Sequence, residues 1–442
     1  MSDLSSSATT ATAPVTGEKH HVAFFRQSGW MMIATTAGGL LMLIVHSVAQ
    51  KMPKSEYGVF FTLLQIVSLI GIPAVGLQGV FAQQAAASLH HEHEKELAGV
   101  FRGVVRGMFF LWLILAVAIF IFRNDILSAL KIANPAALWM TVVIGLATLL
   151  RPISMGILQG RQNFLWMGWV PIIEGAARFG GVCLIVGWLA YQAAGAMAAV
   201  LVGSAVTVLL TGWLCRDCLR GAAAPMDWAG WLRRVVPLTL GLGVGTFMLC
   251  ADMIFVQRFF PKEQTGYYGA AGMIGRALVY FTAPLTAVMF PKVVRSSARG
   301  EKSNALLLTL GVTALAGVCA ALMCTLFPAL PLQVVRYDKS YLEISAPLVP
   351  WFAWSMLPLT LSTVLINSLM ARSQFKAVPW LVAAAAGYAL TLYLRLHALH
   401  DYSSDKFPIV IQTIGIFGLI QLAVCAWFTW GVKGKTKMED GK

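Results

Sequence analysis

Apolar residues fill long, nearly uninterrupted stretches of this chain, and polar residues gather in the short segments between them. Each stretch holds about 20 residues, the length that an α-helix needs to cross the hydrocarbon core of a bilayer. The pattern predicts about twelve membrane-spanning helices, six in each half, with bounds good to about four residues. The predicted spans are 29–49, 58–80, 104–122, 137–158, 167–187, 195–214, 235–257, 267–290, 305–327, 346–370, 378–395 and 408–430.

A short sequence repeat divides these helices into two halves. QKMPKSEYGVFF, which begins at Gln50, is matched in the second half by QRFFPKEQTGYYG. Aligning Pro53 with Pro261 also aligns Gly58 with Gly266, at one constant offset of about 208 residues. Each copy follows one apolar stretch and begins another. An even number of spans in each half predicts parallel repeats, related by an axis along the membrane normal.

Composition and charge support the same fold class, an all-α polytopic membrane protein. Of the 442 residues 58% are hydrophobic and only 12% are charged, about half the charged fraction of a soluble domain. The formal net charge is +14, but the basic residues lie in short loops, so no nucleic-acid partner is predicted. Loops on one side carry about twice as many Lys and Arg as those on the other, which predicts that both termini are cytoplasmic.

These features predict a simple domain organisation without a separate catalytic unit. The loops are short, and the sequence holds no P-loop, nucleophile elbow, zinc-protease motif or dinucleotide fingerprint, so neither an enzyme nor an organic cofactor is predicted. The predicted parts are a disordered cytoplasmic tail (1–25), a six-helix lobe (26–220), a cytoplasmic linker (221–234), a second six-helix lobe (235–430) and a basic cytoplasmic tail (431–442).

Two cysteine and histidine patterns could suggest a metal, but neither has the spacing of a metal site. Cys215 and Cys218 form a CxxC with no second pair, and we interpret them as small buried residues. The HHEHE run from His90 to Glu94 falls in a predicted loop of mixed charge, where solvated side chains are the simpler interpretation. No metal site is predicted.

Five ionisable residues fall inside predicted spans. They are Arg151, Glu174, Arg178, Asp252 and Arg276. Insertion of a central Arg or Asp costs about 2.5–3.5 kcal/mol, so such residues normally face a cavity or a partner. Glu174 and Arg178 have the i, i+4 spacing of a same-face pair. That pair either eases insertion, or Arg178 faces an anionic substrate while Glu174 takes a coupling ion.

The other three residues receive separate interpretations. Arg151 and Arg276 have no carboxylate within a turn of their own helices, so we expect them to line a cavity rather than to pair with another helix. For Asp252, pairing with a neighbouring arginine and a role in ion coupling both remain open.

Neutral polar residues and prolines complete the candidate site. Gln65 and Asn367 lie within spans, where interhelical hydrogen bonds or contacts to substrate hydroxyls would explain them equally. Pro73, Pro284 and Pro350 interrupt spans, and interrupted helices near a repeat interface indicate a gate or hinge.

Several short motifs, spread over nearly the whole chain, carry a family resemblance. They are SEYGVF from Ser55, LQGRQNF from Leu158, ADMIFVQRFF from Ala251, GYYGAA from Gly266 and MFP from Met289. With the twelve-span pattern, they resemble the polysaccharide-transporter branch of the multidrug/oligosaccharidyl-lipid/polysaccharide (MOP) exporter superfamily, which contains the O-antigen-type flippases.

This resemblance implies two six-helix lobes that form a V around a central cavity and work by alternating access. The implied substrate is an oligosaccharide on a polyprenyl pyrophosphate, which crosses the bacterial cytoplasmic membrane. The implied coupling ion is Na⁺ or H⁺, moving down its gradient. The implied partners are polysaccharide biosynthesis proteins. Arg151, Arg178 and Arg276 suit the pyrophosphate, because a guanidinium can make two parallel charge-assisted bonds to phosphate.

Two other functions remain as alternatives. A drug/cation antiporter of the same superfamily would need acidic residues in the cavity, whereas the span interiors hold three arginines against two acids. A membrane polysaccharide polymerase would need a sizeable outer loop with catalytic carboxylates or arginines, and none is present in the sequence.

Overall fold

The computed structural model describes residues 16–87, 91–187, 192–222, 227–298 and 305–431, and every regular element among them is a helix. The first half contains α1 (Thr16–Ala49), α2 (Lys54–Ile70), η1 (Ile72–Ala74), α3 (Leu77–Ala87), α4 (His91–Ile121), α5 (Arg123–Ala129), α6 (Pro135–Gly160), α7 (Phe164–Ile185), α8 (Gln192–Leu214) and α9 (Arg216–Arg220). The second half contains α10 (Trp228–Phe259), α11 (Lys262–Ala298), α12 (Ala305–Leu326), α13 (Leu330–Val334), α14 (Lys339–Ser345), α15 (Leu348–Ala371), η2 (Phe375–Ala377), α16 (Val378–His397), η3 (Ser404–Lys406), α17 (Phe407–Ala426) and η4 (Trp427–Gly431).

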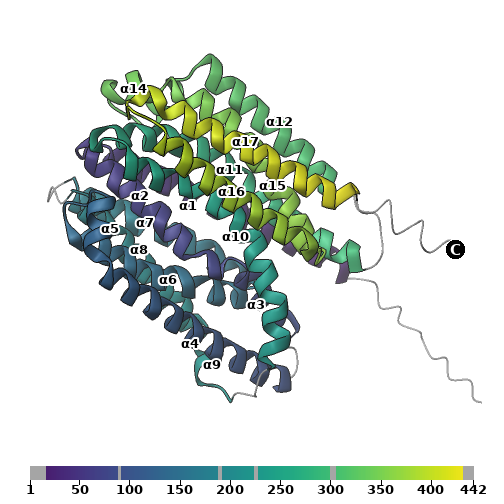
Figure 1. The fold of residues 1–442 in the computed structure, drawn as a ribbon. Helices are drawn as coiled ribbons and strands as arrows, with labels where there is room; N and C mark the ends of the chain where they lie inside the picture. Colours follow the sequence, from purple (N-terminus) through teal and green to yellow (C-terminus); the bar gives the residue numbers. More distant parts are fainter. Residues whose placement is uncertain (1–15, 88–90, 188–191, 223–226, 299–304, 432–442) are drawn as a thin grey trace, which may run out of the picture.

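The two halves of the chain form two helical lobes that lie side by side (Figure 1). The purple and blue helices of the N-terminal lobe occupy one side, and the green and yellow helices of the C-terminal lobe the other. The lobes are close at the end that carries α5 and α14, and they diverge toward the end that carries α9. Helices α10 and α11 of the C-terminal lobe pack against α2 of the N-terminal lobe. This arrangement confirms the predicted fold class.

The observed helices match the predicted spans in number and order, but several extend beyond the predicted bounds by more than four residues. Among the described residues, 9 helices are long and apolar enough to cross a membrane, and a bent pair raises this number to 10. Helices α1 and α11 correspond to the remaining two predicted spans. Helix α4 begins well before the predicted start at 104, because the more polar segment 91–103 is helical as well. Large apolar side chains on α4 and α12 are exposed, as expected for helices that face lipid.

The bent pair is the second predicted span. It consists of 54–70 and 72–86, which meet at an angle of 40°. The short 3₁₀ helix η1 lies at the bend and contains Pro73, which has no amide hydrogen to continue the helical ladder. The prediction of a break at this proline is therefore confirmed, whereas its role as a gate stays a prediction.

Backbone geometry confirms the internal repeat independently of the sequence motif. Among the described residues, the non-glycine residues with positive φ are Lys131 (55°), Gln162 (56°), Arg336 (65°) and Ser373 (55°). Lys131 and Arg336 precede the fourth span of their lobes, and Gln162 and Ser373 follow it. At all four, the next amide donates to the carbonyl five positions before it. Each lobe therefore repeats the same turns around its fourth span.

The repeated glycines lie against each other between the lobes. A Cβ on Gly58 would overlap the hydroxyl of Thr265, and a Cβ on Gly266 would overlap the carbonyl oxygen of Lys54. The helix starts that follow the two aligned prolines can therefore approach only because both positions lack a side chain. The sequence repeat thus marks the point where the two lobes touch.

Candidate functional site

A cluster of three charged side chains lies inside the N-terminal lobe. Glu174 of α7 accepts a hydrogen bond from Arg151 of α6 through one carboxylate oxygen, and one from Arg178 through the other. Arg178 lies one turn further along α7 and also approaches Ser204 Oγ of α8, at 3.4 Å. We call Arg151, Glu174 and Arg178 the N-lobe cluster. It connects three helices through one shared carboxylate.

The N-lobe cluster carries one uncompensated positive charge and is partly open to solvent. The side chain of Glu174 is 3% exposed, those of Arg178 and Arg151 17% and 34%. The Nε of Arg178 is buried and has no hydrogen-bond partner. A Cβ on Gly203 would lie only 2.9 Å from Cγ of Arg178, so the glycine lets α8 approach this side chain. The cluster therefore combines a net positive charge with two partly exposed guanidiniums.

A second charged cluster lies inside the C-terminal lobe and is neutral. Nη2 of Arg276 on α11 donates to both carboxylate oxygens of Asp252 on α10, at 2.5 and 2.7 Å. Nε of Arg276 donates to the carbonyl of Leu249 at 2.7 Å, and the hydroxyl of Tyr268 donates to Asp252 at 2.7 Å. The Arg276 and Asp252 side chains are only 2% and 0% exposed. We call Asp252, Tyr268 and Arg276 the C-lobe cluster.

Aromatic rings enclose the guanidinium of the C-lobe cluster. The guanidinium carbon of Arg276 lies 5.5 Å from the ring centre of Phe61 and 5.9 Å from that of Phe352. Phe61 belongs to α2 of the other lobe. A cation over an aromatic face in a dry site contributes about 0.5–2 kcal/mol. Arg276 therefore fastens α10 and α11 together and also contacts the N-terminal lobe.

The expectation that Arg151 and Arg276 line a cavity instead of pairing with another helix is wrong as to pairing. Each has a carboxylate partner on the preceding or following helix, Asp252 for Arg276 and Glu174 for Arg151. A buried guanidinium without a partner costs free energy, so each arginine pairs with an acid. Both acids lie on neighbouring helices, and residue spacing along one helix cannot reveal such a contact. Arg276 is inaccessible to a substrate in this conformation, and Asp252 has the arginine partner that was one of its two interpretations.

The neutral polar candidates occupy different environments. Gln65 is buried on α2, and its Oε1 has no hydrogen-bond partner. Asn367 is half-buried on α15 and donates through Nδ2 to the carbonyl of Thr363 in its own helix, at 2.8 Å. Their proposed contacts to substrate hydroxyls stay predictions.

At two of the three candidate prolines, Pro284 and Pro350, the helix is not interrupted as expected. Pro350 is the third residue of α15, where the amide hydrogen that proline lacks would have no helical partner, so α15 begins there without interruption. The helix α11 continues through the position of Pro284, whose side chain lies outside the described residues. The expected interruption at Pro350 is therefore wrong, because the proline marks the start of a helix.

The CxxC and HHEHE patterns do not form a metal site among the described residues. Cys215 and Cys218 are buried free thiols, as interpreted from the sequence. His90 and the side chains of 91–93 lie outside the described residues. Among the side chains that are described, no three His, Cys, Asp or Glu residues are grouped in a way that could hold a metal ion.

A buried hydrogen-bond chain joins the lobes near the repeated turns. The hydroxyl of Tyr57 on α2 shares a hydrogen bond with the hydroxyl of Tyr337, in the loop before α14. It also lies 3.0 Å from Nδ1 of His46 on α1. All three side chains are buried. We call His46, Tyr57 and Tyr337 the lobe lock.

The glutamines that begin the two repeat copies reinforce the lobe lock in matching ways. Nε2 of Gln50 donates to the carbonyl of Arg336, and Nε2 of Gln257 donates to the carbonyl of Leu130, each at 2.8 Å. The acceptors lie in equivalent loops of the opposite lobes, at the positive-φ residue Arg336 and directly before the positive-φ residue Lys131. Sequence reasoning missed these contacts, although each quoted copy of the repeat begins with one of these glutamines, which was the available signal.

Comparison with solved structures found the same fold in MOP-superfamily proteins. An inward-facing multidrug resistance MATE family transporter has a TM-score of 0.67 at 14% identity, over 92% of this chain and 96% of that chain. The lipid II flippase MurJ, in an inward closed conformation, has a TM-score of 0.69 at 14% identity, over 91% and 87%. An outward-facing MATE family transporter has a TM-score of 0.62 at 13% identity, over 95% and 96%.

Searches with protein-family models and among curated proteins each found no match. At 13–14% identity, the structural likeness shows the fold alone. Together with the apolar helices, it establishes a multi-pass membrane protein with the two-lobe fold of MOP transporters. The substrate has to be argued from the site.

Proposed function

We propose that this chain is an alternating-access transporter that flips a polyprenyl-pyrophosphate-linked oligosaccharide across the bacterial cytoplasmic membrane, for surface polysaccharide assembly. Both termini are proposed to be cytoplasmic, and polysaccharide biosynthesis proteins are the proposed partners. The observation that carries this proposal is the N-lobe cluster, in which two partly exposed guanidiniums share a single buried carboxylate.

The charge and geometry of the N-lobe cluster suit a phosphate headgroup. Glu174 fixes Arg151 and Arg178 in neighbouring positions and still leaves a net positive charge. The partly exposed guanidiniums of Arg151 and Arg178 can donate charge-assisted bonds to phosphate oxygens. Nη1 of Arg276 also lacks a hydrogen-bond partner, but that side chain is only 2% exposed, so the proposed substrate contact is confined to the N-terminal lobe.

The arrangement of the lobes supports access from the cytoplasm. The lobe lock and the repeated glycines hold the lobes together at the end assigned to the outside by the charge distribution. The lobes diverge at the opposite end (Figure 1). The TM-score is also higher with the inward-facing transporter, 0.67, than with the outward-facing one, 0.62. In this proposal the bend at Pro73, with Pro284, acts as the hinge for the reverse state.

Ion coupling is proposed at Glu174 rather than at Asp252. Asp252 accepts hydrogen bonds on both oxygens from Arg276 and a further one from Tyr268 in a dry site. Glu174 belongs to the partly exposed cluster, where a proton or a sodium ion can compete with the arginines for the carboxylate. Substrate binding and ion binding would then act on the same side chains.

A drug/cation antiporter is the second candidate, favoured by the TM-score of 0.67 with a multidrug resistance transporter. A cationic drug requires an acid with free charge. Both acids inside the predicted spans, Glu174 and Asp252, are paired with arginines. The electrostatics of the described spans therefore favour an anionic substrate.

Reconstitution into vesicles tests the proposal. Purified protein is inserted with a defined pyrophosphate-linked glycan, and the glycan that reaches the opposite leaflet is measured with an enzyme that cannot cross the membrane. Arg178→Gln should lower the flipping rate about tenfold or more, because it removes charge-assisted contacts to the headgroup. The matched control is Arg233→Gln, which removes an exposed cation on α10 and should flip normally.

Two results would overturn the proposal. One is flipping at the wild-type rate in both Arg151→Gln and Arg178→Gln. The other is gradient-driven movement of a cationic dye by vesicles that leave the glycan lipid in place, which would establish the antiporter instead.

A further inference from the structure

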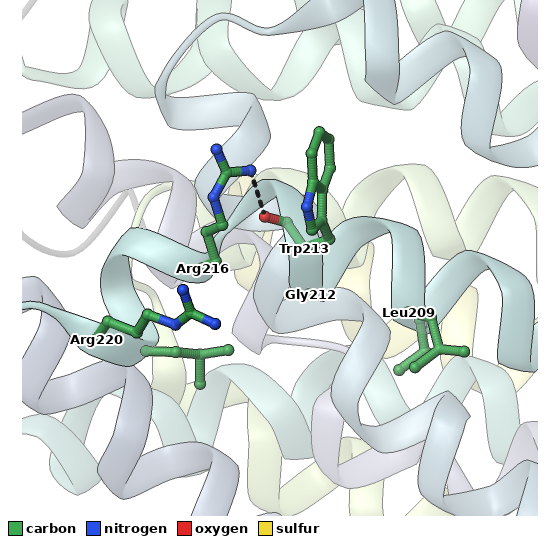
Figure 2. Close-up of a pocket in the computed structure, with 7 residues that line it drawn as sticks. Leu209, Gly212, Trp213, Arg216 and Arg220 are labelled. Carbon is green, nitrogen blue, oxygen red and sulfur yellow. Dashed lines mark hydrogen bonds between the residues drawn. The ribbon is translucent and has the colours of Figure 1, made fainter.

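A groove lies on the outer face of α8 where the chain turns into α9, and it shares no residue with either charged cluster. Its volume is about 670 Å³. Leu209, Gly212 and Trp213 form an apolar wall, and Arg216 and Arg220 lie beside it at the end of the helix (Figure 2). We call this surface the α8–α9 groove. It combines an exposed apolar strip with two cations.

The opposite side of α9 is attached to the lobe, and the acid of this helix is neutralised there. Asp217 forms an ion pair with Arg161, which follows α6, and Cys218 is buried. Burial acts to raise the pKa of Asp217, but the hydrogen bond and charge of Arg161 outweigh it and hold that pKa below its usual range. Arg102 of α4 donates to the carbonyl of Gly221 just after α9. The acid of α9 is therefore occupied by an ion pair with the rest of the lobe.

The two arginines of the groove form an unneutralised pair. Arg216 and Arg220 have the i, i+4 spacing at which like charges destabilise a helix. No carboxylate among the described residues forms an ion pair with either one. Nη1 of Arg216 donates to the carbonyl of Trp213 at 3.4 Å, and its guanidinium carbon lies 4.6 Å from the centre of the Trp213 ring (Figure 2). The guanidinium is therefore held directly at the end of the apolar wall.

We propose that the α8–α9 groove binds a membrane phospholipid with an anionic headgroup. The phosphate lies between Arg216 and Arg220, and an acyl chain runs along Leu209 and Trp213. Helix α8 crosses the membrane, so the turn into α9 lies at headgroup level, on the side that the charge distribution assigns to the cytoplasm. Anionic lipids attract basic residues at that surface. The site does not depend on the proposed transport function.

Native mass spectrometry of the full chain in detergent tests this site. Phosphatidylglycerol is added as the probe, and phosphatidylcholine serves as the uncharged comparison. The wild-type protein should retain one phosphatidylglycerol that phosphatidylcholine does not replace. The double variant Arg216→Gln/Arg220→Gln should bind it about 30-fold more weakly. The control Arg233→Gln/Arg234→Gln removes two exposed cations from α10 and should bind it as the wild type does.

A second variant tests the apolar half of the groove without changing charge. A Cβ on Gly212 would meet no atom within 4 Å, so Gly212→Leu can fill the groove without strain. This variant should also weaken phosphatidylglycerol binding. In a separate thermal unfolding measurement, phosphatidylglycerol should stabilise the wild-type protein and inorganic phosphate should not. The proposal fails if both groove variants retain the lipid, if the control pair loses it equally, or if inorganic phosphate alone reproduces the stabilisation.

Discussion

The N-lobe cluster and the C-lobe cluster use the same chemistry in different proportions. In the N-terminal lobe one glutamate serves two arginines, whose side chains are 17% and 34% exposed. In the C-terminal lobe one aspartate serves one arginine, a tyrosine donates a further hydrogen bond to the aspartate, and the pair is dry. The first arrangement leaves charge available, whereas the second leaves none.

This difference separates a binding role from a structural one. A buried ion pair whose carboxylate oxygens all accept hydrogen bonds holds its helices in register. Removing one partner would leave the other charge buried without compensation, which is strongly destabilising. A shared carboxylate keeps its arginines in place and lets water, an ion or a phosphate compete for them. Arginine inside a span is therefore informative about function only when its partners and its exposure are known.

The largest expected effect comes from breaking the C-lobe cluster. Asp252→Asn leaves Arg276 charged and buried without a carboxylate, and should destabilise the protein by about 3–5 kcal/mol. Thermal unfolding in detergent and the amount of inserted protein measure this loss. In the compensating control, Arg276→Met with Asp252→Leu, apolar packing replaces both charges, so stability should recover. Wild-type stability of Asp252→Asn alone would mean that the C-lobe cluster does not hold its helices together.

Breaking the N-lobe cluster should cost less stability. Glu174→Gln leaves two cations, but both reach solvent in part, so we expect a loss of about 1–3 kcal/mol. The same thermal measurement compares this variant directly with Asp252→Asn. A loss as large as that of Asp252→Asn would remove the distinction between the two clusters.

The lobe lock should respond by a change of conformation rather than by unfolding. Tyr57→Phe removes the hydrogen bonds to His46 and Tyr337, which should destabilise the contact between the lobes by about 1–2 kcal/mol. Hydrogen–deuterium exchange should rise at 54–58 and 262–266. The matched control is Tyr402→Phe, which loses a hydroxyl bonded to Leu396 within one lobe. Equal exchange in both variants would show that the lock does not hold the lobes together.

The smallest effect is expected at an exposed ion pair, Arg161–Asp217, which serves as the reference for the two buried clusters. The folded-state pKa of Asp217 is lowered, so the pair stabilises the protein above the pKa of a free aspartate, and this stability is lost as the pH falls through the folded-state value. Asp217→Asn should cost less than about 1 kcal/mol at pH 7. Its difference from the wild type should shrink below about pH 4, and a constant difference would contradict the assignment.

The sequence predicted those features that depend on neighbouring residues. Apolar runs located the spans, Pro73 located the break in the second span, and the spacing of Glu174 and Arg178 indicated their pair. It did not reveal that Arg276 pairs with Asp252, because that contact depends on how α10 and α11 pack. For the same reason the lobe lock was invisible, since Tyr57 and Tyr337 are far apart in the chain and neither carries a distinctive spacing.

The contact between Gly58 and Gly266 has a consequence for the origin of the chain. Because both sides come from one repeated position, a polypeptide of half this length would carry both surfaces, and two copies would meet there in an isologous homodimer. In a single chain the two copies of this position need not stay identical. Tyr57 has Thr265 as its counterpart in the second copy, so the hydroxyl bridge to Tyr337 is found on one side of this junction only.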